Sequence, residues 1–280
     1  MFDPNIVACL GPEGTHSQAA AKYLFPCSSL VLYPSISAAM SAINKNEASF
    51  CIVPIENSIE GSVNITLDTL SANGNFCIVK ELVWPIRHHL MLKNRDIPFK
   101  KIISHPQALA QCRKTLIKLY PDAILQDALS TALGAEIAAK SSEYAAIGSF
   151  EAAAINNLEI VAHDIQDSQI NCTRFVVIKP SSFQAAEESA AKTSLACELE
   201  GSKPGVLYEL LKEFAERKIN LVRIESRPAR TALGRYIFFL DFEGSSSDPF
   251  IKDALEKVSE NTTWLKILGS YPVINLQKTP

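Results

Sequence analysis

Short apolar runs alternate with Ala-rich segments over the first two thirds of the chain. The apolar runs suit strands that are buried on both faces, and the segments between them suit helices that cover a sheet. This βαβ order predicts a mostly parallel sheet with helices on its faces. Ser35 stands where a helix cap is expected. The first group of elements comprises strands at 5–11, 29–33 and 48–55 and helices at 16–25 and 35–46.

The same order begins again after a long extended segment at 76–92. Two α/β lobes of similar size predict a cleft between them. The apolar run Phe175–Ile178 is then the strand that returns the chain to the first lobe. The second group of elements comprises strands at 101–104, 144–149 and 158–165 and helices at 106–120, 130–142 and 150–157.

The pattern changes at residues 179–192, which are rich in Ser, Ala and Glu and lack apolar periodicity. The elements beyond follow the order βαββαβ, which predicts a ferredoxin-like domain whose first helix is opened by Pro204. We therefore expect an α/β domain at 1–180, a linker at 181–192 and a smaller domain at 193–280. The expected elements of the smaller domain are strands at 193–200, 219–228, 234–244 and 263–273 and helices at 204–218 and 249–260.

Composition narrows the class of protein. Hydrophobic residues make up 47% of the 280 residues and charged residues 20%, which is typical of a globular chain. The net charge is -3 and basic runs are absent, so nucleic acid is not an expected partner. The seven cysteines form no CxxC pair, which argues against a disulfide framework or a metal site. With no signal peptide and no membrane-spanning run in the sequence, we expect a soluble protein of the reducing cytoplasm.

Small polar groups follow several of the expected strands. In GPEGTHSQAA (11–20), helix N-terminal amides with the hydroxyls of Thr15 and Ser17 favour an anion, although a capped helix start is an equal alternative. The motif lacks the spacing of a nucleotide-binding loop. In PIENSIEGSVNITLD (54–68), Glu56, Asn57 and Ser58 lie just past a buried strand, where open α/β sheets bind ligands. A solvated polar turn is the alternative there.

Two further segments have the same character. In SHPQALAQC (104–112), Ser104 stands at the expected helix cap and Gln111 lies further along the helix, so both have ordinary structural roles as alternatives. In NCTRF (171–175), Thr173 and Arg174 precede an apolar strand, where a solvated strand end is the simpler interpretation. His105 is ambiguous. Four such junctions in one chain nevertheless predict a single polar cleft.

These segments, together with STA (130–132), KPGVLYEL (203–210) and ESRP (225–228), occur in one order over nearly the whole chain. In that order they resemble prephenate dehydratase, a family with a C-terminal regulatory ACT domain. Two positions depart from the family pattern: STALGA lacks the second Ala of STAxAA, and Val206 stands where Ala is usual. Both changes are small and apolar, so we expect no loss of function.

The resemblance implies a fold, a reaction and roles for residues. The fold is a two-lobed catalytic domain similar to periplasmic binding proteins, followed by the ACT domain. The family converts prephenate to phenylpyruvate, with loss of carbon dioxide and water, in phenylalanine biosynthesis. It needs no cofactor or metal, because formation of the aromatic ring drives the step. Thr173 would donate to the departing hydroxyl and Arg174 would grip a carboxylate.

Glu56 would repel a dianion if ionised, so it is either a protonated acid or a group that orients its neighbours, and we favour the second role. The residues that the resemblance implies for positioning the substrate are Thr15, Asn57, Ser58, Ser104 and Gln111.

The resemblance also implies a regulatory site for L-phenylalanine between paired ACT domains. Gly205 would allow close approach of the backbone, and Glu225 or Asn220 would meet the ammonium group. The implied residues are Gly205, Val206, Leu207, Asn220, Leu221, Glu225, Ser226, Arg227 and Pro228. The implied assembly is a homotetramer, a dimer of dimers.

Two alternatives stay open: an arogenate dehydratase, and a non-catalytic amino-acid sensor. The intact TRF motif, at 173–175, argues against the sensor.

Overall fold

The structure is a computed structural model, and it describes residues 6–72, 75–181, 190–199, 204–230 and 234–277. The chain divides into two compact units. The first unit consists of residues 1–66, 83–175 and 275–280, and the second of residues 67–82 and 176–274. A segment from the N-terminal half therefore belongs to the same unit as the C-terminal domain.

The first lobe of the first unit is built around β1, which pairs in parallel with both β2 and β3. The strands and helices predicted for this part are confirmed, and the Ser35 hydroxyl caps α2 by accepting from the Ala38 amide at 3.1 Å. The elements are β1 (Ile6–Leu10), α1 (His16–Leu24), β2 (Ser29–Tyr33), α2 (Ile36–Asn44) and β3 (Phe50–Asn57).

These strands belong to a seven-stranded sheet of order β16-β5-β11-β3-β1-β2, with β4 on β3. The strands β5 and β11 each continue from one unit into the other along the chain. The remaining elements here are β4 (Gly61–Ser62), α3 (Asn64–Ala72), β5 (Phe76–Pro85), β11 (Cys172–Pro180) and β16 (Val273–Asn275).

The second lobe is a five-stranded sheet of order β10-β6-β9-β7-β8. It is mixed: β7 runs parallel to β8 and β9, whereas β6 runs antiparallel to β9 and β10. Its elements are β6 (His89–Leu92), β7 (Lys101–Ser104), α4 (Pro106–Gln111), α5 (Arg113–Leu119), β8 (Ile124–Asp127), α6 (Thr131–Lys140), β9 (Tyr144–Gly148), α7 (Phe150–Ile155) and β10 (Glu159–Ala162).

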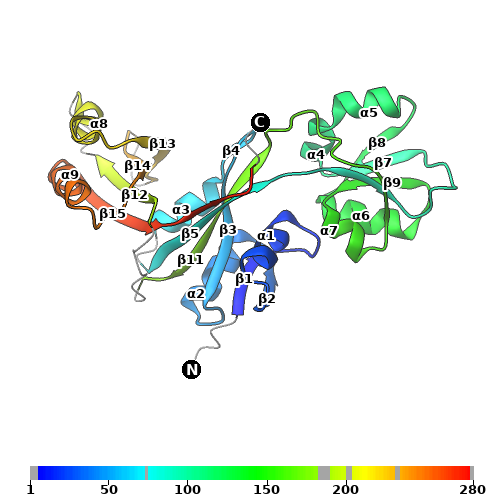
Figure 1. Cartoon of the computed structure of the whole chain (residues 1–280), viewed down its shortest axis with the longest axis horizontal. Helices are drawn as coiled ribbons and strands as arrows, with labels where there is room; N and C mark the ends of the chain where they lie inside the picture. Colours follow the sequence, from blue (N-terminus) through cyan, green and yellow to red (C-terminus); the bar gives the residue numbers. More distant parts are fainter. Residues whose placement is uncertain (1–5, 73–74, 182–189, 200–203, 231–233, 278–280) are drawn as a thin grey trace. The chain divides into compact units, whose positions relative to one another are not determined.

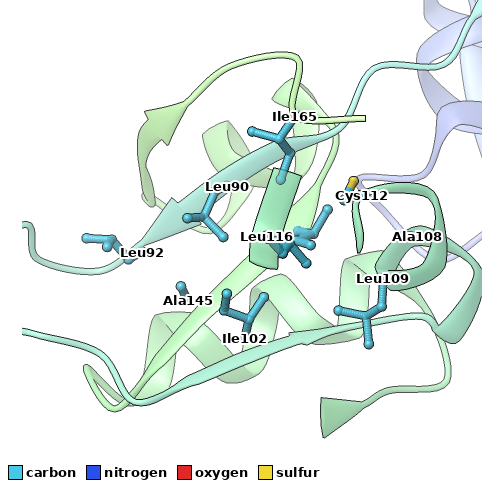
Figure 2. Close-up of a cluster of buried hydrophobic side chains, with 10 residues drawn as sticks. Leu90, Leu92, Ile102, Ala108, Leu109, Cys112, Leu116, Ala145 and Ile165 are labelled. Atoms are coloured by element: carbon cyan, nitrogen blue, oxygen red, sulfur yellow. The ribbon is translucent and has the colours of Figure 1, made fainter. Parts of the chain in front are cut away.

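Alternation along these strands gives each face of the sheet its own core. Leu90, Leu92 and Ile102 pack with α4 and α5 on one face, as Figure 2 shows. Their chain neighbours Met91 and Ile103 pack with α6 and α7 on the other. The helices accordingly lie on both sides of the sheet (Figure 1). Both faces are covered, as the continuous apolar runs predict.

Three details of this lobe differ from the prediction. The single helix expected at 106–120 is two helices, which meet at the buried Cys112. Ser104 is not a cap: it ends β7 and its hydroxyl donates to the Ile147 carbonyl at 2.7 Å. His105 caps α4 instead, because its Nδ1 accepts from the Gln107 amide at 3.3 Å. The strand β8 was not predicted, since all four of its residues are exposed and show no alternation.

A close approach explains one departure from the family pattern. Gly134 lies on α6, and a Cβ there would stand 3.0 Å from the Ile103 carbonyl oxygen of β7. An alanine would push the helix a few tenths of an ångström from the sheet, so glycine allows the tighter contact in this chain.

The C-terminal domain has the predicted order βαββαβ and forms an antiparallel sheet of order β13-β14-β12-β15. Helices α8 and α9 cover one face, where Leu210, Phe214 and Leu240 belong to a buried cluster. Helix α8 begins at Val206 rather than Pro204, because Gly205 is the cap and has the left-handed φ of 89°. The elements are β12 (Lys192–Leu199), α8 (Val206–Glu216), β13 (Leu221–Pro228), β14 (Tyr236–Glu243), α9 (Pro249–Glu260) and β15 (Thr262–Tyr271).

The linker expected at 181–192 falls mostly on residues 182–189, which lie outside the described residues. Within the described part of the chain, no helix has the length and apolarity needed to cross a membrane. All seven cysteines are described, and each is a free thiol.

Candidate active site

A cavity of about 270 Å³ lies between the two lobes of the first unit. Both lobes contribute side chains: the first through α1, β3 and β11, and the second through α4 and the start of α6. The lining residues are His16, Ser17, Pro54, Asn57, Ile86, His88, His105, Gln107, Ala108, Gln111, Leu129, Ser130, Thr131, Asn171, Thr173 and Phe175.

Thr173 and Asn57 meet at this cavity from adjacent strands. The Asn57 Nδ2 group donates to Thr173 Oγ1 at 2.9 Å. An amide nitrogen cannot accept a hydrogen bond, so the hydroxyl hydrogen of Thr173 is not used in this contact. Thr173 is 8% exposed and lines the cavity, and the contact leaves it able to donate to a ligand there.

Gln111 also lines the cavity, and it connects to the same pair. Its Oε1 accepts from Asn171 Nδ2 at 2.9 Å, and Asn171 Oδ1 accepts from Asn57 Nδ2 at 3.0 Å. His88 Nε2 lies 3.0 Å from the same Gln111 oxygen. The predicted residues Asn57, Gln111 and Thr173 are therefore brought together.

Glu56 and Arg174 are not among the residues that line the cavity. On β11, Arg174 alternates with the lining residues Thr173 and Phe175, and successive side chains of a strand point to opposite faces. Arg174 Nη1 donates to Glu56 Oε2 at 2.6 Å, and the two side chains are 15% and 30% exposed. The structure thus has a hydrogen-bonded pair at the cavity and, one position away on the same two strands, an ion pair whose residues are not among the cavity lining.

Three predicted positioning residues bind backbone next to the cavity rather than line it. Thr15 caps α1: its hydroxyl accepts from the Gln18 amide at 3.3 Å and donates to the Leu10 carbonyl at 3.2 Å. Ser58 donates to the Ile170 carbonyl at 3.1 Å and accepts from the Cys172 amide at 3.0 Å. Ser104, described above, is fully buried. These hydroxyls fix the segments that carry the lining residues.

The cavity is polar but carries no permanent charge on its described lining, which contains no Lys, Arg, Asp or Glu. Three helices begin at it: α1 with His16 and Ser17, α4 after His105, and α6 with Thr131. Their N-terminal amides favour an anion. Burial, with the nearby His88 and His89, lowers the pKa of His16 to about 3, so its imidazole is neutral. Burial also lowers the pKa of His88 below its usual value.

The predicted regulatory residues lie in the second unit. Gly205 and Val206 line a cavity of about 370 Å³ together with Glu209 and residues 260–263. Ser226 is exposed and pairs with Phe238 of β14. The Phe238 side chain packs against the buried cluster that helices α8 and α9 cover. Alternation places Glu225 on the opposite face of β13. The structure therefore does not bring the nine predicted residues into one site within a single chain.

Arg227 is engaged elsewhere. Its Nε and Nη2 donate to the two carboxylate oxygens of Asp68 at 2.7 and 3.1 Å, and Arg230 reaches the same carboxylate at 2.7 Å. This contact raises the pKa of the Arg227 guanidinium further above its usual value. Asp68 lies on α3, the helix that follows Asn57 and β4 along the chain, so the ESRP segment binds this helix.

Comparison with known proteins decides the family. The family profile of Prephenate dehydratase matches residues 7–182, and that of the ACT domain matches residues 193–260. The chain belongs to the prephenate dehydratase family. The prephenate dehydratase of Methanocaldococcus jannaschii is 40% identical over 270 residues, which are 94% of this chain and 97% of that protein.

Two further relatives extend the comparison. The arogenate dehydratase/prephenate dehydratase 2 of Arabidopsis thaliana is 38% identical over 282 residues, covering 95% of this chain and 72% of that protein. A crystal structure of the Arthrobacter aurescens prephenate dehydratase in complex with L-Phe is 32% identical. It has a TM-score of 0.87 and covers 95% of this chain and 89% of that one. The predicted family and the predicted fold, an α/β catalytic domain followed by an ACT domain, are confirmed.

Several lining residues were missed at the level of sequence. His88 lies in the long extended segment at 76–92, whose apolar character gave no reason to single out one histidine. Asn171 stood inside the NCTRF motif and could have been selected with Thr173. Ser130 and Thr131 belong to the STA motif, whose side chains were given no role.

Proposed function

We propose that this chain is a prephenate dehydratase that converts prephenate to phenylpyruvate, carbon dioxide and water. The observation that carries the proposal is the contact between Asn57 Nδ2 and Thr173 Oγ1, which leaves the threonine hydrogen to a ligand in the cavity. Family membership supports the reaction. The reaction needs a donor at the departing hydroxyl, and it consumes one proton overall.

The substrate would bind with its ring against the apolar part of the lining, formed by Pro54, Ile86, Leu129 and Phe175. Helix N-termini at the same cavity would face its carboxylates. Thr173 donates to the departing hydroxyl, and Asn57 polarises Thr173 by donating to it. Gln111 positions the substrate. No step in this scheme requires a metal or an organic cofactor.

The other predicted site residues have supporting roles in this proposal. Thr15, Ser58 and Ser104 hold the junctions that present the lining residues. Glu56 and Arg174 form an ion pair, and its proposed role at the site is to order the β3 and β11 positions next to Asn57 and Thr173. The proposed domains are residues 1–180, a linker at 181–192 and residues 193–280.

L-Phenylalanine is the proposed regulator, bound by the ACT domain at the nine predicted residues. The Arthrobacter aurescens prephenate dehydratase was crystallised in complex with L-Phe, which supports this choice. Because Ser226 and Glu225 lie on different faces of β13, a complete site would draw residues from two paired domains. This fits the proposed homotetramer. Seven free thiols favour the cytoplasm as the compartment.

The test is a direct turnover assay with prephenate and with arogenate, using the native chain and two variants. Thr173→Ala should lower kcat by about 100-fold or more with little change in KM, because one donor to developing charge is lost. Thr173→Ser keeps the hydroxyl and should retain most of the activity. A folded Thr173→Ala protein with near-native kcat would refute the role of Thr173. A native chain that turns over neither substrate would favour the amino-acid sensor instead.

A further inference from the structure

The orientation of the Asn57 carboxamide is fixed by the backbone. Its Oδ1 accepts from the Ile59 and Glu60 amides, both at 3.0 Å. Backbone amides only donate, so the oxygen must face them and the Nδ2 group must face the cavity. The Asn57 Nδ2 group therefore donates toward Thr173 Oγ1, Asn171 Oδ1 and the Cys172 carbonyl, which share its two hydrogens.

The orientation of Asn57 determines the orientations of the Asn171 and Gln111 side chains. The Asn171 atom that faces Asn57 Nδ2, at 3.0 Å, must be the oxygen, so the Asn171 nitrogen faces Gln111. The Gln111 atom that receives this nitrogen at 2.9 Å must then also be an oxygen. Reversing any one amide would place two donors face to face, which would cost the hydrogen bond and leave buried polar atoms unpaired.

The chain of hydrogen bonds ends at His88. Its Nε2 faces the same Gln111 oxygen at 3.0 Å, so this nitrogen carries a hydrogen and His88 is the Nε2–H tautomer. The imidazole cannot easily turn away. Its residue is 4% exposed, its backbone amide donates to Gln166 Oε1 at 2.9 Å, and its carbonyl accepts from the Ile165 amide at 2.8 Å.

We propose that His88 is a positioning residue that holds Gln111, and through Gln111 the Asn171 amide, in the orientation set from Asn57, and so keeps this wall of the cavity ordered beside Thr173. The proposal rests on the proposed function of Thr173. With Nε2–H in place, Gln111 Oε1 accepts two hydrogen bonds and cannot flip without losing both. Without it, Gln111 keeps only the hydrogen bond from Asn171 and is held less firmly at the cavity.

The protonation state of His88 does not alter this role, because Nε2 donates in both the neutral and the cationic form. The groups near His88 are His16 of α1, whose ring centroid lies 6.0 Å away, its chain neighbour His89, and the neutral amide of Gln111. No described carboxylate acts on its titration. His88 is neutral in this setting, and removing its titration should leave the pH profile of kcat unchanged.

The experiment compares His88→Gln with His88→Leu in the full-length chain. Glutamine supplies an N–H close to the position of Nε2, whereas leucine fills similar space without a donor. We expect His88→Leu to lower kcat by about tenfold or more, as one hydrogen bond at a preorganised donor would require. His88→Gln should keep kcat within about threefold of native, with an unchanged pH profile. The matched control is His89→Asn, which keeps an acceptor for the Asp164 amide and should not affect kcat.

The outcomes are separable. A folded His88→Leu protein with native kcat overturns the proposal. A His88→Gln protein that is inactive, or that loses one limb of the pH profile, shows that His88 itself transfers a proton and also overturns it. The tautomer is measured independently by ¹⁵N NMR of the native chain: a protonated Nε2 and a bare Nδ1 support the proposal, and the reverse refutes it. That measurement holds even if prephenate is not the substrate, so its failure is distinct from failure of the proposed function.

Discussion

At the scale of single residues, two neighbouring pairs perform different tasks. Thr173 and Asn57 meet at the cavity, whereas Arg174 and Glu56, one position away on the same strands, form an ion pair and are not among the lining residues. On β11 the period of two along a strand separates Arg174 from the lining residues Thr173 and Phe175. Arg174, adjacent in sequence to the proposed catalytic Thr173, pairs with Glu56 in this structure, and the described lining of the cavity presents helix N-termini to an anion.

We expect Glu56→Gln and Arg174→Met each to lower stability by about 1–2 kcal/mol, because each removes a short, partly buried ion pair. Neither should raise KM for prephenate by more than about threefold, since neither side chain lines the cavity. Thermal unfolding and steady-state kinetics measure the two effects. A tenfold rise in KM for Arg174→Met, with unchanged stability, would restore Arg174 as the carboxylate clamp that sequence reasoning favoured.

The sequence predicts the segments around the cavity better than the individual side chains that line it. The motifs identified the segments that surround the cavity, because each is a polar run at the end of a buried strand. They did not identify which side chains enter it. That choice depends on the register of β11 against β3 and on which face the lobes enclose, and both arise from long-range pairing. His88 shows the limit, since only the fold brings it to Gln111 from 23 residues away.

At the scale of elements, α3 connects two motifs that are distant in sequence. It begins at Asn64, soon after the Asn57 turn, and its Asp68 receives both Arg227 and Arg230 of the C-terminal domain. Lys266 Nζ adds a hydrogen bond to the Leu70 carbonyl at 2.7 Å. A displacement of β13 on ligand binding would therefore act directly on the helix that follows a cavity residue.

We expect Asp68→Asn to weaken inhibition by phenylalanine without a matching loss of phenylalanine binding. The neutral amide removes the ion pairs with Arg227 and Arg230 without substituting any of the predicted regulatory residues. A coupling free energy of about 1–3 kcal/mol corresponds to a shift of roughly 5- to 150-fold in the effect of one ligand on the other. Calorimetric affinity for phenylalanine, compared with its half-inhibitory concentration, measures this coupling. Parallel changes in both, or in neither, would show that Asp68 does not carry it.

Elements were predicted well where burial imposes a period and poorly where it does not. The strands covered on both faces and the amphipathic helices of the ACT domain were found by their patterns. Strand β8 is exposed at all four residues and has no apolar signature. No sequence signal marks the break between α4 and α5 at Cys112, because a buried cysteine also suits an unbroken helix.

At the scale of the whole molecule, the two domains are not joined only by a linker. After the ACT strands, the chain returns to the catalytic sheet as β16, next to β5. The Glu81 amide donates to the Pro272 carbonyl at 3.0 Å, and the Leu276 amide donates to the Val83 carbonyl at 3.1 Å. The division into units reflects this return, since residues 67–82 group with the C-terminal domain. A catalytic fragment that ends near residue 181 would lose a strand of its own sheet.

A second link is the ion pair between Lys192 of β12 and Glu81 of β5. Lys192 Nζ lies 2.7 Å from Glu81 Oε1, and the Glu81 side chain is fully buried. Lys192→Met should destabilise the chain by about 3–5 kcal/mol, because it removes a cation that contacts a fully buried carboxylate at 2.7 Å. Combining it with Glu81→Leu should recover most of that loss, since an apolar pair of similar volume needs no compensation. Free energies of unfolding for the single and double variants measure the difference. If the double variant is no more stable than Lys192→Met, the loss in the single variant does not come from the buried Glu81 carboxylate.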